Sequence, residues 1–386
     1  MDDINDQPKP EKQPLQAWLT FAVFILIIGG FFLVNLVAPK PEILISERRL
    51  PAKLPSFDAD SVLSTEFMEG FEDYAADNFI FREALRTLRA ITVFNVFQMG
   101  DKDGLYQGAV GAGKIEPIKT ESVLAWAAKM ERLQADLASQ HDGLKFFYAV
   151  IPDKSLYDAR SLPGYDPVVL ASLLEGRLKA YTSIDLTGAL QASDFYRTDL
   201  HWDQALLGQR SGDVLDVLAR ALGCQSRLTY DFVVRDAGEF TGVFPGQLAL
   251  PMAPDQLRYL TNPVLDKVVV SYLDPRTGEF VKGPVYDLEA ADGRDRYDLF
   301  LRGPQPVVVI ENPSATTDRE LYIFRDSFTS SLAPLLASGY ARVTLIDLRY
   351  IDYRILPQYV DFAPNSDILL LYGSQILNNP TILLIQ

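Results

Sequence analysis

Predicted helices and strands alternate from residue 121 onward, and this pattern constrains the fold more than any other feature of the sequence. Helices are predicted at 121–139, 168–181, 203–222 and 328–338, and strands at 144–151, at 182–186 and near Leu321, Val343 and Ile368. Such an alternation is typical of a parallel sheet with helices on both faces. Because ligands of these sheets bind outside the carboxyl ends of the strands, we expect functional residues there.

Residues 224–317 interrupt the alternation. Short runs rich in β-branched and aromatic residues occur at 230–234, 267–272 and 279–281, with a turn signal at Gly278. This pattern predicts a β-rich insertion between the two halves of the α/β domain. We expect the insertion to pack on the α/β core rather than fold by itself, because the sheet is incomplete without both flanks.

Residues 17–38 (AWLTFAVFILIIGGFFLVNLVA) contain no charged side chain. A run of about 20 apolar residues matches the hydrocarbon thickness of a bilayer, whereas the apolar core of a secretory signal spans about 7–15 residues. We therefore predict a retained transmembrane helix, with a buried core helix as the alternative.

The predicted span divides the chain into a short head and a long extracellular part. Residues 1–16 are predicted to be a disordered cytoplasmic head, residues 39–60 a stalk, and residues 61–386 one domain outside the cytoplasm. Basic residues after the span weakly favour the opposite orientation. Long domains translocate largely regardless of charge, so we expect the domain at the cell surface.

The composition argues against two classes of function. The 51 acidic and 36 basic residues give a formal net charge of −15. This balance argues against a nucleic-acid partner, since binding phosphates requires a basic face. Cys224 is the single cysteine, so the chain can form neither an internal disulfide nor a cysteine-rich metal site.

Ser327 lies where a predicted strand turns into a predicted helix, in the sequence RELYIFRDSF at 319–328. The apolar run 321–324 is short and bounded by charges, and the helix at 328–338 follows it directly. Free backbone N–H groups and the positive end of the helix dipole converge at such a turn. A nucleophile with an oxyanion hole fits this position, and so does a helix N-cap serine without chemistry.

His201 is the better candidate of the two histidines for a general base. His141 lies in a turn at a helix end, where a solvated capping role explains it. Asp199 precedes His201 by two residues, so both side chains point to one face of an extended segment. A carboxylate there can hold the imidazole tautomer that leaves the other nitrogen free as a base. The alternative is an Asp–His pair that only satisfies a loop.

The segment YRTDLHW at 196–202 resembles the signature of the DHHW family, membrane-anchored proteins of mainly Gram-positive bacteria. These proteins are relatives of the SGNH-type polysaccharide O-acetyltransferases that act on alginate. Leu200 stands where the family name has its first histidine, but the relatives' Asp-x-His pattern is intact. Further blocks that resemble the family, in the expected order, are FEDY (71–74), DNFIFR (77–82), VIPDK (150–154), DRYDLFLRG (295–303), FRDSF (324–328) and IDLRY (346–350).

The resemblance implies a fold and a set of site residues. The fold would be SGNH-hydrolase-like (flavodoxin-like), circularly permuted so that the serine comes last in the sequence. Asp199, His201 and Ser327 would form the catalytic triad. Further candidates for the oxyanion hole or for substrate contacts are Gly373, Gln375, Arg349 and Trp202. Gln375 replaces the family's asparagine, and Arg349 could either bind an anionic sugar or pair with Asp347.

Two hypotheses of function follow. The first is a membrane-anchored, cell-surface O-acyltransferase or esterase that acts on a polysaccharide through an acyl-enzyme, without a metal or organic cofactor. A membrane-bound O-acyltransferase would supply the acyl groups. The alternative is a non-catalytic glycan-binding or scaffold protein on the same fold. A serine oxygen within about 3 Å of the histidine nitrogen favours the enzyme.

Overall fold

The computed structural model describes residues 15–56, 65–108, 111–158 and 164–385, which form two compact units that divide between Arg89 and Ala90. Most of the predicted cytoplasmic head lies outside the described residues. The predicted domain at 61–386 therefore contributes its first part to one unit and its remainder to the other.

The N-terminal unit contains the apolar helix α1 (Leu15–Val37), followed by α3 (Thr65–Asp77) and most of α4 (Arg82–Ile91). Among the described helices, only α1 is long and apolar enough to cross a membrane, with a mean hydropathy of 2.5. Asp77 accepts hydrogen bonds from Arg49 Nη1 and Nη2 at 2.5 and 2.6 Å and from the Ala52 N–H at 2.8 Å. These bonds tie the segment after α1 to the end of α3.

The second unit is built on an eight-stranded mixed sheet with the strand order β4-β3-β12-β10-β11-β9-β7-β8. The first five strands in this order pair in parallel, and β9, β7 and β8 pair antiparallel. The strands are β3 (Lys145–Ile151), β4 (Thr182–Ser183), β7 (Val269–Leu273), β8 (Phe280–Gly283), β9 (Val307–Glu311), β10 (Glu320–Arg325), β11 (Arg342–Ile346) and β12 (Asp367–Gly373). The predicted α/β architecture is thus present as a parallel-rich sheet.

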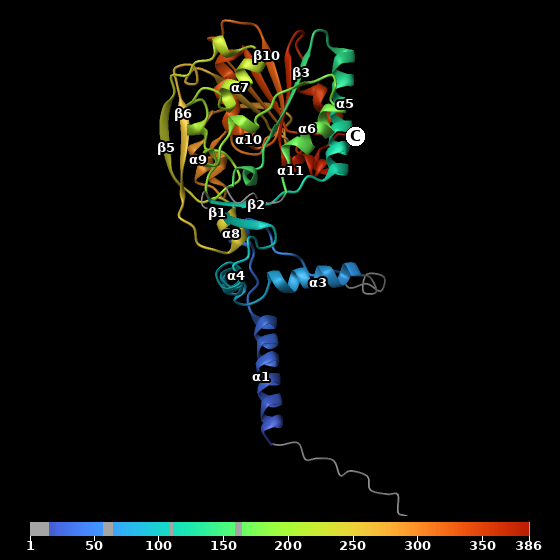
Figure 1. The fold of residues 1–386 in the computed structure, drawn as a ribbon, viewed down its shortest axis with the longest axis vertical. Helices are drawn as coiled ribbons and strands as arrows, with labels where there is room; N and C mark the ends of the chain where they lie inside the picture. The colour runs from blue at the N-terminus through green and yellow to red at the C-terminus, as the bar shows by residue number, and fades with distance from the viewer. Residues whose placement is uncertain (1–14, 57–64, 109–110, 159–163, 386) are drawn as a thin grey trace, which may run out of the picture. The chain divides into compact units, whose positions relative to one another are not determined.

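Helices cover both faces of this sheet (Figure 1). On one face lie α5 (Thr120–Gln140), α6 (Pro167–Glu175) and the short α11 (Ser374–Leu377), and on the other α7 (Val214–Ala221) and α10 (Phe328–Leu336). A hydrophobic core lies on each face of the sheet, and the side chains of β10 alternate between them. Leu321 and Ile323 belong to one core, and Tyr322 and Phe324 belong to the other. The continuous apolar run of this strand reflects burial on both faces.

The stretch predicted as a β-rich insertion divides between two places. The strands β5 (Val233–Phe240) and β6 (Asp255–Thr261) form a separate antiparallel pair. The helix α8 (Phe244–Leu248) connects them along the chain, and α9 (Leu288–Ala291) follows β8. The strands β7, β8 and β9 instead extend the main sheet. A hairpin of β1 (Leu105–Gly108) and β2 (Gly111–Lys114) precedes α5.

The helix predicted at 203–222 is wrong in its first half. Only Val214–Ala221 is α-helical, after a single 3₁₀ turn at Gln204–Leu206. Gly208 and Gly212 have φ values of 73° and 79°, which right-handed helix does not allow. Asp213 then caps α7 by accepting a hydrogen bond from the Asp216 N–H at 3.1 Å.

Candidate functional site

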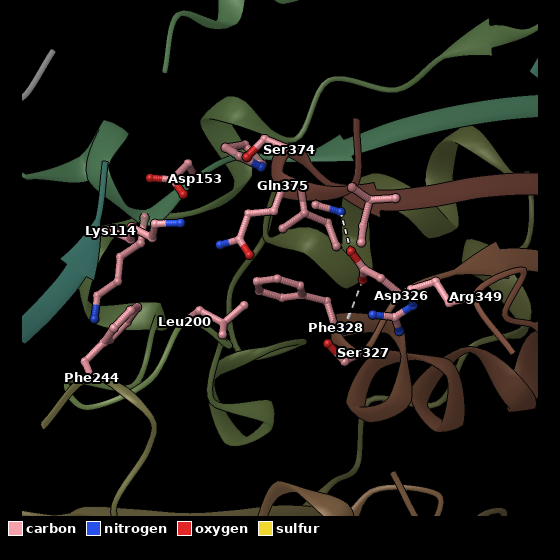
Figure 2. A pocket seen from close by; sticks show the side chains of 15 residues that line it. Lys114, Asp153, Leu200, Phe244, Asp326, Ser327, Phe328, Arg349, Ser374 and Gln375 are labelled. Carbon is pink, nitrogen blue, oxygen red and sulfur yellow. Dashed lines mark hydrogen bonds between the residues drawn. The ribbon is translucent and has the colours of Figure 1, made fainter. Parts of the chain in front are cut away.

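A pocket of about 250 Å³ lies at the carboxyl ends of four parallel strands (Figure 2). Its walls include Asp153 after β3, Ser327 after β10, Arg349 after β11 and Gln375 after β12. The edge of the sheet where ligands were expected therefore carries a concave site.

Asp199, His201 and Ser327 meet in one hydrogen-bonded chain beside this pocket. His201 Nδ1 lies 2.6 Å from Asp199 Oδ1, and His201 Nε2 lies 2.8 Å from Ser327 Oγ. Asp199 and His201 are buried, whereas Ser327 is half-buried and lines the pocket. The structure thus joins residues 126 positions apart in the arrangement that nucleophilic catalysis requires, with one serine oxygen accessible.

The loop that carries Asp199 and His201 is folded back on itself. Phe195 and Trp202 form a bridge, and the Tyr196 N–H donates to the His201 carbonyl at 3.0 Å. The Asp255 carboxylate, at the start of β6, accepts hydrogen bonds from the N–H groups of Arg197 and Thr198 at 2.9 and 2.8 Å. The β5–β6 pair therefore fixes the loop from outside the main sheet.

Gly242 and Val243 hold Asp199 from the other side. The Val243 N–H donates to Asp199 Oδ2 at 3.1 Å, and the Gly242 N–H donates to Thr198 Oγ1 at 2.8 Å. A Cβ at Gly242 would lie 2.3 Å from Asp199 Cβ and 2.4 Å from the Thr198 carbonyl oxygen, so only glycine fits. Burial opposes the charge of Asp199, but the charge and hydrogen bonds of His201, with the Val243 N–H, lower the pKa of Asp199.

Lys154 is a buried lysine that ties the same loop to β2. Its Nζ donates to the carbonyl oxygens of Ala112 at 2.7 Å, Tyr196 at 2.6 Å and Asp199 at 3.4 Å. Burial lowers the pKa of Lys154 to about 8, against the attraction of Asp199. The neighbouring Asp153 lines the pocket, and burial raises the pKa of its carboxyl to about 6.

Aromatic rings fix the plane of the His201 imidazole. Tyr297 stacks on it with ring centroids 3.9 Å apart and an interplanar angle of 12°, and Phe328 lies 4.9 Å away. The Tyr297 hydroxyl and the Trp202 Nε1–H both reach Ser331 Oγ, at 2.9 and 2.8 Å. Trp202 is fully buried and does not line the pocket, so its prediction as a substrate contact is wrong: the indole packs inside and supports the loop.

Asp326 links the turn after β10 to the end of β12. It accepts hydrogen bonds from the Gly373 N–H at 2.6 Å and from the Phe328 N–H at 3.1 Å (Figure 2). Burial raises the pKa of Asp326 despite these bonds. Gly373, a predicted oxyanion-hole candidate, lines the pocket, but its backbone N–H is engaged by Asp326 and is not free to donate to an oxyanion.

Gln375 and Arg349 both face the pocket. Within the described ranges no hydrogen bond engages the carboxamide of Gln375 or the backbone N–H of Ser327. Arg349 Nε and Nη2 donate to the fully buried Asp347 at 2.9 and 2.7 Å, so the predicted pair with Asp347 is present. Burial opposes the charge of Arg349, but the bonds to Asp347 outweigh it and raise the pKa. A guanidinium held in place by Asp347 therefore lines the same pocket as Ser327.

Solved structures resemble this chain in fold. PatB1 from Bacillus cereus matches with a TM-score of 0.57 and 20% identity, over 72% of this chain and 98% of that chain, and it has also been solved with a sulfonyl adduct. A DHHW family protein from Eubacterium siraeum matches with a TM-score of 0.56 and 15% identity, over 73% and 94% of the two chains. The chain has the fold of these two proteins.

A weaker likeness extends to an acetyltransferase. The O-acetyltransferase domain of Pseudomonas putida AlgJ matches with a TM-score of 0.41 and 15% identity, over 72% of this chain and 92% of that chain. At that TM-score the likeness supports no inference. No protein-family model matches the sequence, and no curated protein sequence does so either.

Several residues that build the site carried no role in the sequence prediction. Lys154 and Tyr297 lie in blocks that resemble the DHHW family. Their contacts with Asp199 and His201 become visible only in the structure, where both residues are buried. Gly242 and Asp255 lie in the stretch predicted as an insertion, where no motif marks them. Their importance comes from long-range packing, which local sequence patterns do not encode.

Proposed function

We propose that this chain is an O-acyltransferase or esterase that acts on a polysaccharide through an acyl-enzyme on Ser327. The observation that carries the proposal is the chain of contacts from Asp199 through His201 to Ser327 Oγ, at 2.6 and 2.8 Å, opening into a pocket. A serine used only as a helix cap would need neither the imidazole nor the buried carboxylate behind it.

The geometry allows a balanced two-step reaction. Ser327 Oγ attacks the acyl carbonyl while His201 Nε2 takes its proton; the donor's oxygen then leaves and takes that proton from His201. In the second step a sugar hydroxyl, or water, gives its proton to His201 and attacks the acyl carbon. Ser327 Oγ leaves and regains the proton, and Asp199 stabilises the imidazolium in both steps.

The oxyanion that forms in each step would be stabilised by the Ser327 N–H, the Gln375 carboxamide and the charge of Arg349. All three residues line the same pocket, where preorganised donors would stabilise developing negative charge. Gln375 is one methylene longer than the asparagine of the family pattern, and its carboxamide lies among the side chains of Asp153, Leu200 and Phe328 (Figure 2).

The proposal that the substrate is a polysaccharide and that a partner supplies the acyl group rests on the resemblance to the DHHW family and its acetyltransferase relatives. In this proposal a membrane-bound O-acyltransferase delivers acyl groups and the sugar chain receives them. A non-catalytic scaffold on the same fold would not require Ser327 to be accessible at the pocket wall, so the enzyme is favoured.

A sulfonyl fluoride tests the nucleophile directly. We expect phenylmethylsulfonyl fluoride to modify Ser327 of the full-length chain stoichiometrically, because the Oγ lies 2.8 Å from a base. Intact-mass and peptide mass spectrometry should show the adduct on Ser327, its absence in Ser327→Ala and its slow formation in His201→Gln. The control Ser172→Ala removes an exposed serine of α6 and should label normally. Modification spread over exposed serines would contradict the proposal.

We further propose that α1 anchors the chain in the membrane with the second unit outside the cytoplasm. The helix has 23 residues without a charged side chain. In the proposed function the sugar substrate would lie at the cell surface, which requires the second unit on that side. Protease added to intact cells or spheroplasts should digest residues beyond 39 and leave a protected fragment that contains α1. Protection of the second unit in intact spheroplasts and its digestion only after lysis would contradict this topology.

A further inference from the structure

A second hollow, of about 510 Å³, lies on the surface outside the strands β11, β9, β7 and β8. We call it the Tyr350 groove. Its walls include Tyr350, Arg276, Arg302 and Pro304. Neither the triad nor the proposed oxyanion donors contribute to it.

The sheet register places this groove on the same edge as Ser327. Ile346, the last residue of β11, pairs with Val307, the first residue of the antiparallel β9. The next strand, β7, runs antiparallel to β9, and its last residues therefore lie beside the first residues of β9, with Tyr272 paired to Val308. The segments that line the groove therefore leave the sheet at the edge where β10 and β12 end and where the pocket with Ser327 lies. These segments are 347–350, 302–306 and 274–279.

Adjacent residues join the two hollows. Arg349 lines the catalytic pocket and Tyr350 lines the groove. The guanidinium of Arg349 lies 5.3 Å from the centre of the Tyr350 ring, and the buried Arg325 donates to the Gln305 carbonyl in the groove wall at 3.4 Å. A ligand chain that passes over Arg349 would enter the groove without leaving the protein surface.

The side chains of the groove suit sugars. Tyr350 is 47% exposed, so its ring can offer a flat apolar face for stacking. Arg302 is held by Asp287 through a 2.6 Å hydrogen bond and lies over the Tyr272 ring at 5.2 Å, so its guanidinium is preorganised. Arg276 is exposed. Guanidinium groups donate hydrogen bonds to hydroxyl and carboxylate oxygens, while a ring face packs against the C–H face of a pyranose.

We propose that the Tyr350 groove is an acceptor subsite that binds sugar residues of a polysaccharide chain whose acylated unit lies at Ser327. The inference rests on the proposed function for its orientation, because the acylated hydroxyl must reach the catalytic pocket. The groove gives a reason for acting on chains rather than single sugars: units beyond the reacting one add contacts without taking part in the chemistry.

Binding measured in the absence of turnover separates this inference from the proposed function. Full-length chain with Ser327→Ala, in detergent, is titrated calorimetrically with pentasaccharides and disaccharides of β-1,4-linked glucose, N-acetylglucosamine and mannuronate. We expect at least one pentasaccharide to bind more tightly than its disaccharide. The further change Tyr350→Ala should weaken that pentasaccharide about fivefold to tenfold, since a lost ring contact costs on the order of 1 kcal/mol.

Matched variants isolate the ring. Tyr350→Phe keeps the stacking face and should bind like the parent, and Tyr230→Ala removes a similarly exposed tyrosine outside the groove and should have no effect. Unchanged affinity in Tyr350→Ala, or no binding of any pentasaccharide, overturns the inference. So does a photo-crosslinker at position 350 that captures a protein and no glycan in cells. Hydrolysis of p-nitrophenyl acetate by the wild type reports separately on the proposed function.

Discussion

Ser327→Ala and His201→Gln are each expected to lower kcat/KM for p-nitrophenyl acetate by about 10³-fold or more. In the proposed mechanism Ser327 Oγ becomes nucleophilic when His201 Nε2 removes its proton across the 2.8 Å contact, so either change would stop the same step. For that reason the double variant should be little worse than either single variant.

The two histidines of the chain provide a matched control for this experiment. His141→Gln removes the other imidazole, which packs near Phe362 and lies far from the triad in the fold, and should retain wild-type kcat/KM. Steady-state rates of the full-length protein in detergent give all four values, with thermal unfolding to verify folding. Multiplicative losses in the double variant would mean that Ser327 and His201 act separately, against a shared acyl-enzyme step.

The sequence predicted the parts of the site that depend on local patterns. A strand that turns into a helix at Ser327 is visible in RELYIFRDSF. The pairing of Asp199 with His201 was also predicted, but it forms in a loop that folds back on itself rather than in an extended segment. The predicted strand near Ile368 pairs with β10, and the predicted strand at 144–151 pairs with that strand in turn, so the carboxyl ends of all three border the pocket.

The sequence did not predict features that depend on distant packing. The run VVVIE at 307–311 looks like other short strands of an insertion, and only its pairing with β11 and β7 makes it part of the main sheet. Gly208 and Gly212 interrupt an apparent helical pattern through their positive φ values. Trp202 is next to His201 in sequence, yet its side chain turns into the core and donates to Ser331.

Lys154 shows how such packing positions the residues of the candidate site. Burying a lysine is costly unless its ammonium group is hydrogen-bonded. Here the ammonium donates to the carbonyl oxygen of Ala112 in β2 and to those of Tyr196 and Asp199 in the loop that carries His201. Burial also lowers the pKa of Lys154, because it disfavours the charged ammonium. The position of Asp199 is thus fixed by three separate segments: Lys154 after β3, Asp255 at β6, and the Gly242–Val243 turn.

Gly242→Ala is expected to lower kcat/KM for p-nitrophenyl acetate by about 10²-fold while the protein still folds. The new Cβ would lie 2.3 Å from Asp199 Cβ and 2.4 Å from the Thr198 carbonyl, so the catalytic loop must shift. A shift would weaken the 2.6 Å contact that orients His201 without removing any triad side chain. The loss should appear in kcat, because orientation of the base matters in the transition state.

Gly188→Ala provides the matched control, because a Cβ at Gly188 would meet no atom within 4 Å. Both variants make the same chemical change, and comparing their kcat/KM and unfolding temperatures separates the steric effect at Asp199 from the general effect of replacing glycine. Wild-type kcat in a folded Gly242→Ala protein would mean that the loop tolerates displacement of Asp199. The carboxylate would then not be the group that orients His201, and the triad would reduce to a Ser–His pair.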